Sequence, residues 1–324
     1  MPPLRARARA HPNVALVKYW GKRPGTHNIP AAPSLSVTLD GLTTVTDVRF
    51  DAELDADRFV LNGQPVDDVR ISACLDRLRT RAGSPLKAEV DTHNDFPTAA
   101  GLASSASGFA ALVTAVDAAL GLGLSPAERS VEARLASASA ARSVFGGFVA
   151  LDGIGSDSAR WFATPLEADP AWLEVVVAVN ETETKPVSSS EGMRRSALTS
   201  PFYNPWLDET RLDFDLAQAA IAGRDFERLA TISERSCLEM HAVMMTSSPA
   251  LLYWNTATFV CMHEVTKLRA AGTPVFFSID AGPQVKAVCE RGASAVVARV
   301  LGAVPGVLDT RTVGLGPGAT VEAP

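Results

Sequence analysis

The chain has 324 residues, a length that predicts about two domains. Its 47% hydrophobic content excludes a disordered chain, a disulfide-stapled miniprotein and a collagen-like repeat. With 30 Lys and Arg against 36 Asp and Glu, the formal net charge is −6, so no general positive field is available for a polyanion and we expect no nucleic-acid partner.

Strands and helices alternate in the first half of the chain. Alternating Leu35, Val37 and Leu39, followed by Asp40-Gly41 and a β-branched run, predict a hairpin over residues 35–50, and Asn62-Gly63 predicts a second hairpin. Hydrophobic periodicity predicts helices at 69–81, 105–120 and 127–138, and strands at 86–92, 147–151 and 173–179. This half is therefore expected to be α/β.

Longer helical patterns follow the polar stretch 180–190. They predict helices at 214–222, 226–245 and 251–271, before strands return at 274–279 and 295–300. We place the domain boundary in this polar stretch, with one domain over 1–183 and a second α/β domain over 184–324. The last strand of the second domain can return to the first domain. Because no low-complexity linker separates the domains, we expect them to pack closely around a ligand cleft.

The cysteines and the hydropathy pattern bear on the cellular compartment. The four cysteines form no CxxC pair, which favours buried free thiols in a reducing compartment over a zinc ribbon or a disulfide framework. The N-terminus lacks the apolar block of a secretory signal, and no apolar run reaches the roughly 18 residues of a membrane span. We expect a cytoplasmic protein with no membrane partner.

Small residues are concentrated in segment 95–108, directly before an apolar helix. Small side chains let a ligand approach the backbone, and the free N–H groups of a helix N-terminus attract anions, so the segment is a candidate phosphate loop. The lysine and spacing of a Walker loop are absent. The alternative is that these residues only permit close helix packing.

Three cations, Lys18, Lys22 and Arg23, lie within six residues beside an apolar strand. Next to a phosphate loop they suggest an anionic substrate, with Lys18 projecting into the cleft. The alternative is a solvated edge strand whose lysines prevent strand pairing with other chains.

Three further positions stand at the ends of predicted elements, and each has a structural alternative. Arg142 precedes Gly146-Gly147 and offers a fork suited to a carboxylate or phosphate, or it caps the end of its helix. Asp280 ends a buried strand, where reacting groups of α/β proteins are common, or it caps a following helix. Ser188 to Ser190 contact phosphate or cap the helix after them.

In combination these segments resemble mevalonate diphosphate decarboxylases of the GHMP kinase superfamily over nearly the whole chain. The matching motifs, in the family's order, are Lys18-Tyr-Trp-Gly-Lys-Arg23, Pro33-Ser-Leu-Ser-Val-Thr38, Phe96-Pro-Thr-Ala-Ala-Gly-Leu-Ala-Ser-Ser105, Arg142-Ser-Val-Phe-Gly-Gly147, Val187-Ser-Ser-Ser-Glu-Gly-Met193 and Asp280-Ala-Gly-Pro283. The resemblance implies a two-domain GHMP kinase-like α/β (α+β) fold, a homodimer, and an active site in the cleft between the domains.

The resemblance also implies an activity. Family members use ATP and Mg²⁺ to convert 5-diphosphomevalonate to isopentenyl diphosphate, ADP, phosphate and carbon dioxide, through phosphorylation of the 3-hydroxyl. We expect Mg²⁺ to be carried by ATP, near Ser105, and we assign no metal ligand set to the protein itself.

Site residues are carried over by motif. Asp280 matches the catalytic aspartate, Lys18 its neighbouring lysine, and Arg142 the arginine that holds the substrate carboxylate. Positions that match substrate contacts are Tyr19, Lys22, Arg70, Ser137, Ser139, Ser188 and Ser189. Positions that match the ATP phosphate loop are Gly101, Leu102, Ala103, Ser104, Ser105 and Ser107.

Two positions depart from the family pattern. Ala138 stands where a glycine is common and Gln284 where an asparagine is common, which bears on the shape of the diphosphate pocket. Because Lys18, Arg142 and Asp280 are all present, we do not assign the chain to the related mevalonate 3-kinases, which phosphorylate without decarboxylating.

Other functions stay open at this point. The closest rival is a decarboxylase of 5-phosphomevalonate that yields isopentenyl phosphate. A non-catalytic sensor of nucleotide and small molecule is a second alternative. A serine hydrolase is disfavoured because the GxSxG elbow is absent.

Overall fold

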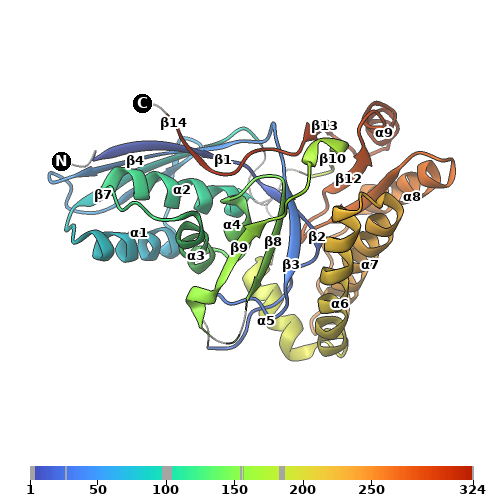
Figure 1. The fold of residues 1–324 in the computed structure, drawn as a ribbon, viewed down its shortest axis with the longest axis horizontal. Helices are drawn as coiled ribbons and strands as arrows, with labels where there is room; N and C mark the ends of the chain where they lie inside the picture. Colours follow the sequence, from blue (N-terminus) through green and yellow to red (C-terminus); the bar gives the residue numbers. More distant parts are fainter. Residues whose placement is uncertain are drawn as a thin grey trace.

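The structure is a computed structural model of the chain, and it describes residues 4–25, 28–96, 104–153, 155, 157–181 and 187–322. The molecule is elongated, with both chain ends at one end and the long helices of the second half at the other (Figure 1). No helix within these ranges combines the length and apolar character needed to cross a membrane.

A six-stranded sheet forms the end of the molecule near the termini. Its strands, in spatial order, are β14 (Thr320–Glu322), β1 (Arg5–Ala10), β4 (Thr44–Asp51), β7 (Lys87–Asn94), β5 (Arg58–Leu61) and β6 (Gln64–Pro65). β5 and β7 pair in parallel and the other neighbours are antiparallel. Since β14 pairs with β1, the last strand returns to the beginning of the chain (Figure 1).

Helix α2 (Ser104–Leu120) lies directly against one face of this sheet, at β1 and β4. Helices α1 (Val69–Ala82) and α3 (Pro126–Ala136) pack against α2. Nearly all of α2 is buried, including Ala110, Ala111 and Ala115. Its small side chains therefore serve close packing, whatever its first turn binds.

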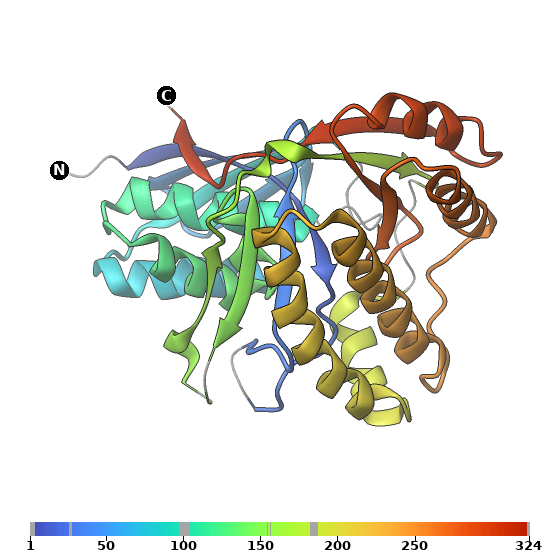
Figure 2. The same ribbon diagram turned by 45° about the vertical axis from the view of Figure 1, so that its right-hand side comes forward.

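A four-stranded sheet occupies the centre of the molecule. It contains β2 (Asn13–Val17), β3 (Ser34–Thr38), β8 (Phe148–Gly153) and β9 (Trp161–Pro165). One side carries the short helix α4 (Ala140–Ser143), and the other packs against α6 (Tyr203–Ala222) and α7 (Phe226–Met245). Figure 2 shows α6 and α7 in front of this sheet.

A second four-stranded sheet belongs to the other half of the molecule. In spatial order it contains β11 (Val275–Ile279), β12 (Val285–Glu290), β10 (Leu173–Val179) and β13 (Asp309–Gly314). The remaining elements are α5 (Ser189–Thr199), α8 (Thr256–Ala270), α9 (Ser294–Gly302) and the 3-10 turns η1 (Ser158–Arg160) and η2 (Pro170–Trp172). α7, α8 and α9 pack on this sheet.

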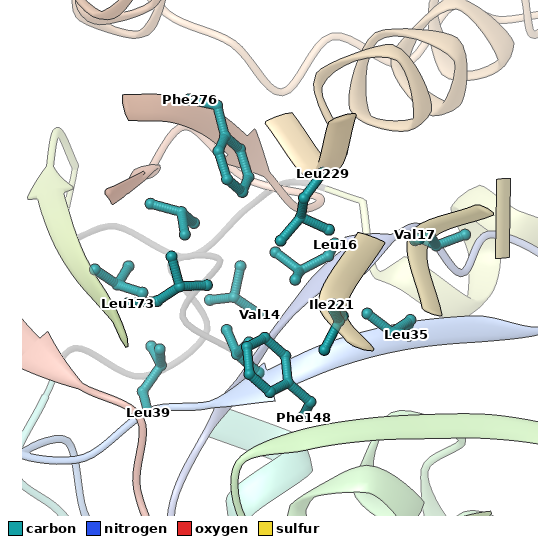
Figure 3. Packing of buried hydrophobic residues seen from close by; sticks show 14 of the residues in the cluster. Val14, Leu16, Val17, Leu35, Leu39, Phe148, Leu173, Ile221, Leu229 and Phe276 are labelled. Carbon is teal, nitrogen blue, oxygen red and sulfur yellow. The ribbon is translucent and has the colours of Figure 1, made fainter. Parts of the chain in front are cut away.

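One hydrophobic core joins the two halves. Val14 and Leu16 of β2 pack in a single buried cluster with Leu229 of α7 and Phe276 of β11 (Figure 3). Full burial of such a side chain stabilises the fold by about 2 kcal/mol. The strand that leads to Lys18 is therefore fixed against the strand that leads to Asp280.

Most predicted elements are confirmed. The helices expected at 69–81, 105–120 and 226–245 are α1, α2 and α7, and the strand expected at 173–179 is β10. The Asn62-Gly63 hairpin is also present as β5 and β6. Both turn residues have positive φ (50° and 76°), as a two-residue type I′ turn requires.

Two predicted elements are wrong. The hairpin over 35–50 does not form, because after Asp40-Gly41 the chain passes from one sheet to another, with β3 in the central sheet and β4 in the six-stranded one. The strand expected at 295–300 is helix α9. Val297 and Leu301, four residues apart, are its buried positions, so one helical face packs on the sheet despite the valine-rich sequence.

The boundary expected at residue 183 stays a prediction. β10, which the sequence analysis assigned to the first domain, is hydrogen-bonded to β12 and β13 of the second half. β12 itself was not predicted.

Candidate active site

The centre of the candidate site is an ion pair between Lys18 and Asp280. Lys18 follows β2 and Asp280 follows β11, and Lys18 Nζ lies 2.7 Å from Asp280 Oδ1. The two strands are joined directly, since Ser278 Oγ donates to the carbonyl oxygen of Ala15 at 2.7 Å. The Lys18 side chain is 1% exposed and that of Asp280 is 25% exposed, so the carboxylate is the member that a ligand can reach.

A second lysine, Lys286 of β12, approaches the same carboxylate. Its Nζ lies 3.3 Å from Asp280 Oδ2. Burial opposes ionisation of Asp280, but the charges of Lys18 and Lys286 outweigh it and hold the pKa of Asp280 well below its usual value. Asp280 is therefore an anion at neutral pH. Lys286 was missed by the sequence analysis, although a lysine inside the apolar run 285–289 is a detectable signal.

Arg142 of α4 presents a buried cation beside this pair. Its guanidinium donates to Ser36 Oγ (3.0 Å), Ser34 Oγ (2.6 Å) and Asn13 Oδ1 (3.2 Å). The side chains of Ser34 and Ser36 lie on the face of β3 opposite to Leu35 and Val37, as strand alternation requires. The described residues thus supply Arg142 with neutral partners and no ion pair.

Burial lowers the pKa of Arg142 to about 10, against an opposing effect of the Asp280 charge, so the guanidinium remains charged at neutral pH. A buried cation without a paired carboxylate is a site suited to an anionic group. Asn13, Ser34 and Ser36, which orient it, were also missed. Their signal was polar residues alternating with apolar ones in a buried strand.

These positions decide the structural alternatives raised for three residues. Asp280 does not cap a helix, because the turn after it leads into β12. Arg142 donates to β2 and β3 rather than to the carbonyls of its own helix. Lys18 is not a solvated edge-strand lysine, since it is buried between the two halves.

The predicted diphosphate-binding cations lie on neighbouring elements. Lys22 Nζ donates to Ser190 Oγ at 3.2 Å, and its pKa is lowered by burial and by the charge of Arg70. Arg70 is exposed, bonded to Asp68, and stacked over Phe109 at 5.2 Å from the ring centroid. Repulsion between the two cations would be relieved by an anion between them.

Tyr19 lies beside this region with its hydroxyl buried, and among the described residues that hydroxyl has no hydrogen-bond partner. Burial raises the pKa of Tyr19, so the group stays protonated at neutral pH. An unpartnered buried hydroxyl is costly unless a ligand completes it, which agrees with a substrate contact.

The predicted serine contacts occupy two places. Ser137 and Ser139 are half-buried between α3 and α4, with their hydroxyl oxygens 3.4 Å apart. Ser188 caps α5 by accepting the N–H of Glu191 at 3.3 Å, and Ser189 is the first residue of that helix. The structural alternative thus holds for Ser188, whose hydroxyl proton stays available to a ligand.

The predicted phosphate loop is described in part. Gly101, Leu102 and Ala103 lie outside the described residues. Ser104 and Ser105 form the start of α2, and Ser105 is exposed there. In contrast to the expected phosphate contact, the hydroxyl of Ser107 is buried and lies 2.7 Å from Thr44 Oγ1 of β4. Ser107 therefore fastens α2 to the sheet.

The two departures from the family pattern are both buried. Gln284 accepts the N–H of Asn180 at 2.6 Å and donates to the carbonyl oxygen of Glu181 at 2.5 Å. The longer side chain therefore anchors the end of β10 to the turn that carries Asp280. Ala138 lies between the serines Ser137 and Ser139.

Two family models match the chain. The model described as diphosphomevalonate decarboxylase-like N-terminal domain covers residues 10–160, and the one described as mevalonate 5-diphosphate decarboxylase C-terminal domain covers 175–311. The chain belongs to the diphosphomevalonate decarboxylase family. The resemblance found in its motifs is thereby confirmed.

Relatives in this family match along most of their length. Diphosphomevalonate decarboxylase from Candida albicans is 35% identical over 291 residues, which cover 84% of this chain and 80% of that protein. The crystal structure of mevalonate diphosphate decarboxylase from Staphylococcus aureus superposes with a TM-score of 0.93 at 37% identity, covering 98% of both chains. The structure of MDDEF in complex with MVAPP, AMPPCP and magnesium gives 0.92 at 37% identity, covering 99% of both.

These comparisons confirm the two-domain GHMP kinase-like fold expected from the sequence. Membership of this decarboxylase family identifies the chain as an enzyme of the carboxy-lyase class.

Proposed function

We propose that this enzyme converts 5-diphosphomevalonate and ATP to isopentenyl diphosphate, ADP, phosphate and carbon dioxide. The observation that carries the proposal is the ionised Asp280 between two lysines, close to a buried Arg142 with neutral partners. In such a site the aspartate can accept the proton of a hydroxyl group and the arginine can bind a carboxylate. Phosphorylation and decarboxylation of a hydroxy acid need both groups.

In the first step Asp280 accepts the proton of the substrate 3-hydroxyl as its oxygen bonds to the terminal phosphorus of ATP and the bond to ADP breaks. Lys18 keeps Asp280 ionised and offsets negative charge on the transferring group. The low pKa of Asp280 makes it a weak base, so its main contribution is to orient the hydroxyl and take up the proton late.

In the second step the C–O bond to phosphate breaks and the C–C bond to the carboxylate supplies the electron pair of the new double bond. Arg142 grips the carboxylate with its fork and holds this C–C bond in line with the departing phosphate. No covalent enzyme intermediate is required.

Substrate is held at its other end by the diphosphate. We assign this contact to Lys22, Arg70 and Tyr19, with Ser137 and Ser139 on one side and Ser188 and Ser189 on the other. The support is the mutual repulsion of Lys22 and Arg70 and the unpartnered hydroxyl of Tyr19.

ATP phosphates are assigned to Gly101, Leu102, Ala103, Ser104 and Ser105, of which the last two begin α2. This 17-residue helix has no acidic residue in its first turn, so its free N–H groups suit an anion. Mg²⁺ would enter with ATP near Ser105 and neutralise phosphate charge. The relative solved with AMPPCP and magnesium supports ATP and Mg²⁺ as ligands of the enzyme.

Product analysis tests the reaction. Incubation with ATP, Mg²⁺ and 5-diphosphomevalonate should release carbon dioxide and inorganic phosphate in equal amounts. Phosphate transfer without carbon dioxide would indicate a 3-kinase instead, and nucleotide binding without products would indicate a sensor.

Substrate length is tested by comparing kcat/KM for 5-diphosphomevalonate and 5-phosphomevalonate. We expect the diphosphate to be preferred, and Lys22→Met to reduce that preference by about tenfold or more, because one charge-assisted phosphate contact is lost. Lys267→Met removes an exposed lysine of α8 that pairs with Glu264 and should leave the ratio unchanged. A preference for the monophosphate would contradict the proposal.

We also propose that the enzyme is a cytoplasmic homodimer. Its four cysteines are buried free thiols, which suits a reducing compartment. Large apolar side chains are exposed on two adjacent helices, Leu212 and Leu216 on α6 and Leu238 and Met245 on α7, and such surface favours association. Sedimentation at micromolar concentration should give a dimer that Leu212→Glu or Leu238→Glu weakens; a monomer at all concentrations would contradict the proposal.

A further inference from the structure

Lys286 is a buried charge outside the motifs that identified the family resemblance. It lies on the central strand β12, opposite Ser278 of β11 and Val177 of β10, and its side chain is 1% exposed. Strand alternation places it on the same sheet face as Val288, which packs in the core shared by the two halves. A lysine in this position carries a large desolvation cost unless an anion offsets it.

The offsetting anion is Asp280. Lys18 holds Oδ1 at 2.7 Å and Lys286 approaches Oδ2 at 3.3 Å, so one carboxylate is held by an ammonium group on each oxygen. Charge balance needs only one of these lysines, and buried ion pairs contribute little net stability compared with apolar residues of the same shape. Stability alone therefore does not account for the second lysine.

The charges around Asp280 are mostly positive. The groups that face it are Lys18, Lys286 of β12, Arg142 of α4, and Cys237 and His241 of α7. Burial raises the pKa of Cys237 to about 11 and lowers that of His241 to about 3, so both are neutral near pH 7. Within the described part of the chain, three cations and one carboxylate thus meet before any anionic substrate is bound.

We propose that Lys286 is a positioning residue, which holds the buried Oδ2 of Asp280 so that Oδ1, beside Lys18, faces the substrate hydroxyl. This inference rests on the proposed function. Since Lys286 is almost fully buried while Asp280 is partly exposed, the lysine acts through the carboxylate and not on the substrate.

Two substitutions of Lys286 test the inference. Lys286→Met removes the charge and retains the length, and should lower kcat about 10- to 100-fold at pH 8 while each KM changes less than about threefold, as expected for loss of orientation in the transition state. The loss should be similar at pH 8 and pH 6, because Lys18 remains paired with Asp280 in the variant and keeps the carboxylate ionised over this range. Lys286→Arg should recover most of kcat at both pH values.

A matched control separates positioning from general loss of a buried cation. Arg79 lies in the first half of the chain, away from the site; its side chain is 7% exposed and pairs with Asp57. Arg79→Met should lower Tm and leave kcat and its pH profile unchanged. If Lys286→Met does not fold, Lys286→Gln against Lys286→Arg gives the same comparison.

The inference is overturned if Lys286→Met stays within about twofold of the wild type at both pH values, or if the Met and Arg variants lose equal activity at every pH. The proposed function is tested separately by Asp280→Asn. An inactive Asp280→Asn beside a normal Lys286→Met would refute the role of Lys286 alone, whereas an active Asp280→Asn would refute the proposed function itself.

Discussion

Two buried arginines in the first half of the chain are held in opposite ways. Arg79 of α1 donates to both carboxylate oxygens of Asp57, at 2.7 and 2.9 Å, and also pairs with Asp76. Arg142 of α4 is equally buried but donates to two serines and an asparagine. Arg79 lies in the 14-residue helix α1 and Arg142 in the four-residue helix α4, and the sequence around them does not reveal how each is held.

The comparison separates structural charge from charge reserved for a ligand. A buried cation is tolerated when hydrogen bonds and a counter-ion offset its desolvation. For Arg79 the chain supplies the counter-ion. For Arg142 the hydrogen bonds are present but no residue that the structure describes supplies a paired carboxylate, so the substrate carboxylate is the natural partner.

The strongest test concerns Asp280, the anion that lies near Arg142 without pairing to it. Asp280→Asn keeps the shape of the side chain but removes the proton acceptor, so we expect kcat to fall by about 10² to 10⁴. ATP affinity, measured by titration calorimetry, should stay within about twofold because Asp280 is assigned to the substrate hydroxyl and not to ATP. Near-normal turnover would contradict the assigned role.

Arg142→Gln tests directly whether the charge of Arg142 serves to bind the substrate carboxylate. Loss of the carboxylate fork should reduce kcat/KM by about 10², the usual effect of removing one preorganised donor. The free energy of unfolding should change by less than about 1 kcal/mol, since the lost hydrogen bonds and the relieved desolvation oppose each other. A large loss of stability with normal catalysis would make Arg142 a structural residue like Arg79.

Arg79→Met should show the reverse pattern. It leaves the carboxylate of Asp57 without its partner, which destabilises a protein by about 3 kcal/mol when the pair is buried. Urea unfolding measures this loss, and kcat per folded molecule should be unchanged. Loss of turnover without loss of stability would remove the contrast between the two arginines.

A cluster between α6 and α7 has more carboxylates than cations, the opposite of the excess of cations around Asp280. Substitution there has the smallest expected effect. Glu239, Asp213 and Glu209 share Arg235. Burial and the neighbouring carboxylates raise the pKa of Glu239 from 4.5 to about 7. The Glu239 carboxyl group therefore binds its proton more tightly in the folded state than in the unfolded state. The stability that this proton binding contributes is fully present below pH 4.5 and is lost as the pH rises through 7.

Glu239→Gln should consequently raise the free energy of unfolding by about 1 kcal/mol at pH 8 and change it little at pH 5. Thermal unfolding at the two pH values measures the difference. An equal effect at both would show that Glu239 does not titrate in this range.

Local sequence determined the regular elements with strong periodicity and the small-residue start of α2. It also located Lys18, Arg142 and Asp280, because motif residues at strand and helix ends are visible in one dimension. It failed where partners came from distant segments. The expected hairpin over 35–50 was wrong because β3 and β4 pair with strands far away, and α9 is helical because Val297 and Leu301 pack on a sheet formed elsewhere.

The tertiary structure alone decided how the charges are paired. Lys18 and Asp280 are 262 residues apart in the chain, and their contact depends on the core that fastens β2 to β11. Lys286, Asn13, Ser34 and Ser36 acquire their roles only in that arrangement. The sequence by itself determined which charged groups this protein has. The strength of each charge interaction depends on burial and on the distance between the charges, and both are defined only once the strands have packed.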